Sequence, residues 1–68
     1  MHVKDIKVDE AVVAFSSDEL AFLCSAINEA LEIVENWEFR IRTGETPERA
    51  QQIMNELGSI REKMRRPL

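Results

Sequence analysis

Few side chains in this 68-residue chain could carry out chemistry. His2 is the only histidine, and its place near the start of the chain makes it a poor general base or metal ligand. Cys24 is the only cysteine and stands among apolar residues at helical spacing, which favours a small buried hydrophobe over a reactive thiol. No metal-ligand spacing, glycine-rich phosphate loop or nucleophile–base pair is present. We therefore expect no enzyme activity, cofactor or metal.

The charge balance indicates the class of partner. A net charge of −4 disfavours nucleic acid as a ligand and suits a basic protein partner. The cations near the C-terminus form a short cluster that this net charge opposes (Arg61, Lys63, Arg65, Arg66). No apolar run approaches the roughly 20 residues of a membrane span. A lone cysteine without a secretory signal favours the cytoplasm.

Residues 16–43 are predicted to form one long amphipathic helix. Ser16 and Glu19 have the spacing of a capping box, and Gly44 suits the left-handed position after a helix. Neither glycine nor proline interrupts the residues between. The whole chain, 1–68, is one small domain.

A second helix is expected over residues 47–64, with Thr46 as its N-cap. Gly58 lies beside the apolar stripe of this helix and would allow the first helix to approach closely. Residues 65–68 are expected to be a frayed tail, because a proline there ends any helix. The short connection forces the two helices to pack antiparallel.

The N-terminal arm, residues 1–15, carries β-branched residues in partial alternation. Residues 11–15 are the better strand prediction, whereas residues 3–8 are either a second strand or a frayed arm. The Asp9–Glu10 pair lacks the glycine that a tight hairpin turn prefers. A strand without a partner would be a template for pairing with another chain.

The first helix has two apolar ridges that together span about 200° of its circumference. The main stripe contains Leu20, Leu23, Cys24, Ile27, Leu31, Val34 and Ile41; the second ridge contains Phe22, Ala26, Ile33 and Trp37. The second helix offers a stripe of only about 120°, so it covers one of them. The second ridge would then be covered by the N-terminal strand, by another chain or by both. Trp37 is thus either a core plug or an interface anchor.

Polar residues of the first helix give a candidate partner-binding surface. Glu29, Glu32, Glu35 and Glu38 recur every third residue and are either a solvated face or a surface for a basic partner. Glu38 falls inside the apolar stripe, where it either reaches water or pairs with Arg42, four residues on. Asn28 borders the stripe, as a half-exposed residue or one that specifies register and oligomeric state.

The segment from Asp18 to Leu57 contains DELAFLCSAINEALE, WEFRIRTG and ERAQQIMNEL. It resembles small bacterial helical-hairpin proteins of the kind found as immunity proteins beside polymorphic or contact-dependent toxins. The resemblance implies a cytoplasmic protein that neutralises a toxin domain by binding it.

The expected fold is mainly α: an antiparallel two-helix hairpin preceded by a short β-strand or hairpin. A chain of this length buries only about 60% of its unfolded surface, so we expect a homodimer to complete it. The expected function is an immunity-type inhibitor that occludes a basic toxin domain. The alternative is a homodimeric structural or regulatory subunit that uses strand pairing and the Trp37 ridge.

Overall fold

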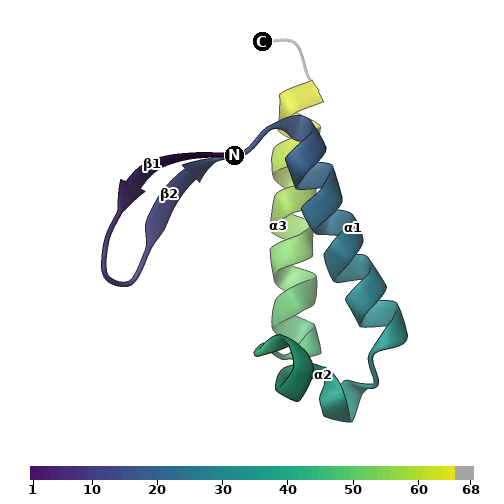
Figure 1. Cartoon of the computed structure of the whole chain (residues 1–68). Helices are drawn as coiled ribbons and strands as arrows, with labels where there is room; N and C mark the ends of the chain where they lie inside the picture. Colours follow the sequence, from purple (N-terminus) through teal and green to yellow (C-terminus); the bar gives the residue numbers. More distant parts are fainter. Residues whose placement is uncertain (66–68) are drawn as a thin grey trace.

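The computed structural model describes residues 1–65. In chain order the elements are β1 (His2–Ile6), β2 (Ala11–Ala14), α1 (Ser17–Ile33), α2 (Asn36–Thr43) and α3 (Pro47–Arg65) (Figure 1). The mainly helical fold with an N-terminal antiparallel pair of strands is confirmed. Arg65 closes α3 rather than starting a tail, and the remainder of the predicted frayed tail lies outside the described residues.

The prediction of one helix over residues 16–43 is wrong, because the chain leaves helical geometry at Val34 and Glu35. Val34 is extended, with φ −83° and ψ 127°, and its N–H donates to the Ala30 carbonyl at 3.0 Å. Glu35 is also non-helical, at φ −59° and ψ 143°. A β-branched residue loses less side-chain freedom in extended backbone than in a helix, so Val34 suits the break. α1 and α2 therefore have separate axes, and the helical phase of α1 does not continue into α2.

The break changes which residues of α2 face the core. In a continuous helix turning about 100° per residue, Ile41 would continue the main apolar stripe and Phe39 would lie well outside it. In the structure Phe39 is 2% exposed and Ile41 is 80% exposed. The assignment of Ile41 to the main stripe is corrected accordingly. Burial of the large Phe39 ring is the gain that a straight helix could not provide.

The helix boundaries follow the capping signals of the sequence. Ser16 Oγ accepts the Glu19 N–H at 3.2 Å, and the Glu19 carboxylate accepts the Ser16 N–H at 2.9 Å, which completes the capping box. Gly44 ends α2 at φ 81°, and its N–H donates to the Arg40 carbonyl at 2.8 Å. These predictions are confirmed.

The second predicted helix is α3, which begins at Pro47. Thr46 Oγ1 accepts the Arg49 N–H at 3.2 Å, as the predicted N-cap should. α1 and α3 lie side by side and run antiparallel, with α2 joining them at one end (Figure 1). Gly58 plays no part in their packing, since a Cβ added there would meet nothing within 4 Å. The expectation that it permits close approach is wrong.

The core is small and takes one residue from each helix. Among residues 1–65, the buried apolar side chains are Leu20 of α1, Phe39 of α2 and Ala50 of α3. Cys24 is half-buried as a free thiol. A core of this size leaves much of the apolar surface of the helices in contact with solvent.

The N-terminal arm is a hairpin, so the alternative of a frayed arm is wrong. Its strands pair antiparallel, with Ile6 opposite Ala11 and Val3 opposite Val13. Lys7 donates its N–H to the Glu10 carbonyl at 2.8 Å and closes the turn without a glycine. The hairpin extends sideways from the helices rather than covering them (Figure 1).

Candidate protein-binding surface

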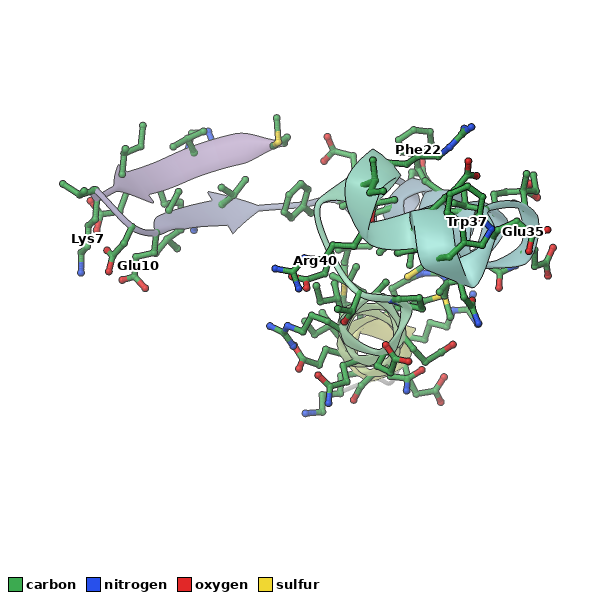
Figure 2. All side chains as sticks on the ribbon, turned by 90° about the horizontal axis from the view of Figure 1, so that it is seen from below. Lys7, Glu10, Phe22, Glu35, Trp37 and Arg40 are labelled. Atoms are coloured by element: carbon green, nitrogen blue, oxygen red, sulfur yellow. The ribbon has the colours of Figure 1, made fainter. Side chains whose placement is uncertain are left out.

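The second apolar ridge of the sequence lies open in the structure. Phe22, Ile33 and Trp37 are 70%, 71% and 73% exposed, whereas Ala26, also exposed, lines the groove between the helices that Phe39 lines too. In Figure 2 Phe22 and Trp37 lie on the side of α1 and α2 that faces away from α3. Trp37 is therefore not a core plug within this chain. Exposed apolar side chains that gather on one side are typical of an interaction surface.

The break between α1 and α2 forms an open notch of about 400 Å³ beside Trp37. Its walls come from the end of α1, the two extended residues and the start of α2 (Leu31, Glu32, Ile33, Val34, Glu35, Asn36, Trp37). Both apolar and carboxylate side chains line it. Figure 2 shows Trp37 and Glu35 next to each other on this side of the molecule.

Ile41 extends the apolar part of this surface. It follows Trp37 by four residues in α2, a spacing that places two side chains on the same face of a helix. Only a straight helix would place Ile41 in the main apolar stripe. The exposure of Trp37 and Ile41 together is a direct result of the break.

Three carboxylates lie beside these apolar side chains. Glu29 and Glu32 are exposed on the last two turns of α1, and Glu35 is exposed between the helices. Within residues 1–65 none of the three forms an ion pair. We call Glu29, Glu32, Ile33, Glu35, Trp37 and Ile41 together the Trp37 surface.

The other two predicted partner-binding residues neutralise each other. Arg42 Nε lies 3.4 Å from a Glu38 carboxylate oxygen, and the Glu38 side chain is only 29% exposed. Pairing with Arg42, four positions later, was one of the two alternatives predicted for Glu38. Asn28 is exposed and donates from Nδ2 to Glu32 at 3.3 Å. Its role in register stays a prediction.

A second apolar hollow lies where the hairpin meets α1. It has a volume of about 360 Å³ and is lined by Met1, Phe15, Asp18, Glu19, Phe22 and Leu23. The Met1 ammonium donates a hydrogen bond to the Glu19 carboxylate. That hydrogen bond, with the one from the Ser16 N–H, lowers the pKa of Glu19 from 4.5 to about 2. The same contact ties the start of β1 to α1.

An apolar groove of about 230 Å³ lies between the three helices. Phe39, Ala50 and Ile53 form part of its wall, and Glu45 stands at its edge. Phe39 had no role in the sequence analysis, and only the position of the break could have pointed to it. The groove adjoins the core and brings together no nucleophile and base.

The groups considered for catalysis or metal binding lie apart. His2 is exposed on β1, whereas Cys24 is half-buried on α1. Among residues 1–65 no three His, Cys, Asp or Glu side chains are placed to hold a metal ion together. None of the helices in that range combines the length and apolar character needed to cross a membrane. Comparison with protein-family models, curated proteins and solved structures found no match.

Proposed function

We propose that this chain is a non-catalytic protein-binding module, an immunity-type inhibitor that neutralises a bacterial toxin domain by occluding it. The observation that carries the proposal is Trp37, 73% exposed on α2 and bordered by Ile33 and Glu35. Tryptophan is among the residues most enriched at the energetic centres of protein interfaces. A tryptophan side chain that is exposed to solvent in the folded chain is available to act as such an anchor.

The carboxylates of the Trp37 surface define the chemistry of the partner. Glu29, Glu32 and Glu35 present three negative charges without an intramolecular cation among residues 1–65. Charges of one sign beside an apolar anchor speed encounter with a partner of opposite charge and suppress wrong partners. A domain with a basic cleft, such as a nuclease, has that opposite charge. Binding at the cleft would block access of the nucleic acid.

The first observation to make is whether the neighbouring reading frame encodes a large secreted protein with a variable C-terminal domain, and that domain would be the partner to test. The affinity of the chain for that domain is measured by titration calorimetry. Trp37→Ala is expected to weaken binding about 30-fold or more, since truncating an interface anchor costs about 2 kcal/mol or more. Ile60→Ala, which truncates an exposed apolar residue of α3, is the matched control and should leave the affinity within about twofold.

The acidic part of the proposal has its own test. Charge reversal at Glu32 and Glu35 should slow association with the toxin domain and reduce the salt dependence of the rate. The fold should be unchanged, because both side chains are exposed. Equal affinity and equal rates for the reversed and the original chain would contradict the acidic surface, and equal affinity for Trp37→Ala would contradict the anchor.

The second candidate is a homodimeric structural or regulatory subunit that uses strand pairing and the Trp37 ridge. The exposed hairpin favours it. In that case Trp37 is buried by a second copy, so its fluorescence should shift to the blue as protein concentration rises. In the inhibitor proposal, Trp37 emission shifts only when the toxin domain is added.

A further inference from the structure

The hairpin has one entirely apolar face. Directly opposed residues of an antiparallel pair point to the same face of the sheet. Val3 lies opposite Val13 and Ile6 lies opposite Ala11, and the register shifts between Val3 and Asp5. The extra residue, Lys4, allows Val3 and Ile6 to share a face although they are three positions apart. We call Val3, Ile6, Ala11 and Val13 the apolar hairpin face.

The helices of the same chain leave this face uncovered. Val3 and Ile6 are exposed, and Figure 2 shows the hairpin extending away from the helices, with Lys7 and Glu10 at its far end. An isolated two-stranded hairpin is marginally stable at best in water and needs further strands or a packed layer. Such an arm gains its stability from another surface.

The chain, including its hairpin, exposes more surface than a compact chain of the same mass. The chain exposes 5679 Å², whereas a compact monomer of 7.9 kDa exposes about 4,400 Å². The excess of about 1,300 Å² is larger than the roughly 800 Å² that each partner buries in a standard stable interface. The radius of gyration, 13.7 Å, likewise exceeds the ~11 Å of a compact chain of this length.

The two edges of the hairpin differ in their readiness to pair. The β1 edge carries the bulge and the charged Lys4 and Asp5, which are features that natural sheets use to prevent further pairing. β2 reads Ala-Val-Val-Ala, with no charge and no bulge. The β2 edge is the open one.

The outward groups of β2 can be assigned from the turn. Lys7 and Glu10 close the hairpin through the bond from the Lys7 N–H to the Glu10 carbonyl. In an antiparallel pair, hydrogen-bonded and non-hydrogen-bonded positions alternate, so Ile6 and Ala11 form the next, non-hydrogen-bonded pair. The N–H and C=O of Ala11 therefore point outward, and two residues on, those of Val13 do the same.

We propose that a second copy of this chain pairs with β2 antiparallel, about a two-fold axis at Val12, to form a four-stranded sheet with the order β1-β2-β2-β1. Ala11 of one copy then exchanges hydrogen bonds with Val13 of the other, and Val12 lies opposite Val12. This register pairs Ala11, Val12 and Val13 of β2 with the same three residues of the second copy. It also joins the two apolar hairpin faces into one continuous apolar layer.

A second copy fits this edge better than an unrelated chain. A two-fold axis brings the same surface of both copies together, so a small, uncharged strand meets an equally small, uncharged strand. It carries no charge that a second copy would repel. The dimer goes beyond the proposed inhibitor function, because the Trp37 surface lies on the helices, away from the hairpin (Figure 2), and pairing of the hairpins should leave it open.

The mass in solution, measured by light scattering across a wide concentration range, tests the dimer. A mass of two chains is expected at micromolar concentration, and a monomer throughout would overturn the proposal. Ala11→Pro removes an outward N–H without removing a bond within the hairpin, and it should raise the dimer dissociation constant about tenfold or more. Ile6→Pro removes the equivalent N–H from the β1 edge and should leave the dimer intact. The reverse pattern would place pairing at β1 and contradict the proposal.

A cross-link tests the register. Non-hydrogen-bonded antiparallel partners have Cα atoms about 4.5 Å apart, within reach of a disulfide. Val12→Cys, made with Cys24→Ser, should oxidise to a covalent dimer at low protein concentration. Lys4→Cys in the same background, on the β1 edge, should stay reduced under the same conditions. Equal cross-linking of both variants, or of neither, would contradict pairing at Val12.

Discussion

Phe39 and Ile41 are two residues apart on α2, yet one is the most deeply buried large side chain of residues 1–65 and the other is almost fully exposed. Their difference follows from the extended residues Val34 and Glu35, which detach α2 from the helical phase of α1. The same rotation that buries Phe39 leaves Trp37 and Ile41 in water. The small core and the candidate interface are thus two consequences of one break.

Replacement of Phe39 by alanine should destabilise the fold by about 3–5 kcal/mol, through lost burial and the cavity that remains. Since domains of this size have a free energy of unfolding of about 3–10 kcal/mol, that loss would be a large share of the total stability. Phe39→Leu, which keeps most of the volume, should cost about 1.5 kcal/mol or less.

Ile41→Ala is the matched control for that series, and urea unfolding followed by circular dichroism measures all three variants. The control should change the free energy of unfolding by less than about 0.5 kcal/mol. A larger cost for Ile41→Ala than for Phe39→Ala would mean that the helix is continuous.

The two glycines should respond to alanine in opposite directions. Gly44 has φ 81°, so Gly44→Ala forces a left-handed conformation and should cost about 1–2 kcal/mol. Gly58 lies in α3 with open space around an added Cβ, so Gly58→Ala should stabilise by about 0.5–1 kcal/mol. Thermal unfolding of both variants compares them directly, and a destabilised Gly58→Ala would show that the helices pack more closely than described.

Loss of the N-cap of α1 should have a measurable cost. Ser16→Ala removes the acceptor of the Glu19 N–H and should destabilise by about 1 kcal/mol. Ser17→Ala, one position inside the helix, keeps the cap and should be neutral or slightly stabilising. The free energy of unfolding from urea titration separates the two, and equal effects would argue against the capping box.

The carboxyl of Glu19 should titrate far below its ordinary value. Its pKa is lowered to about 2 in the folded chain, against 4.5 without these contacts, first by the hydrogen bond from the Met1 ammonium and then by that from the Ser16 N–H. Because the folded pKa is the lower one, the stabilisation is complete above about pH 4.5 and is lost as the pH falls toward 2.

An NMR titration of the Glu19 side chain measures this pKa. Acetylation of the N-terminus removes the largest cause and should raise the pKa toward 4.5. A titration unchanged by acetylation would assign the shift to the capping box alone.

The sequence predicted those elements whose signals are local. Ser16, Thr46 and Gly44 marked helix ends because their preferences act within one turn, and the structure has the ends there. The break at Val34 carried no glycine or proline, so the pattern alone did not reveal it. The two extended residues change the helical phase of everything after them. A prediction of one continuous helix therefore places Ile41 in the core and leaves Phe39 out of it.

The candidate surface was predicted in part for the same reason. Phe22, Ala26 and Ile33 precede the break, and their exposure follows from the width of the apolar face of α1. Trp37 was placed on the same ridge, and it is exposed on α2 just past the break. The apolar hairpin face depends on the bulge at Lys4, which no short-range sequence signal specified.

The central claim is that the Trp37 surface is open in the free protein and available to a partner. Acrylamide quenching of the single tryptophan tests this most directly, because quenching requires contact between the indole and the solvent. We expect red-shifted emission and near-complete quenching at every protein concentration, including those at which the chain is a dimer. Blue-shifted emission that resists quenching in the free protein would show that Trp37 is already covered, and would contradict the claim.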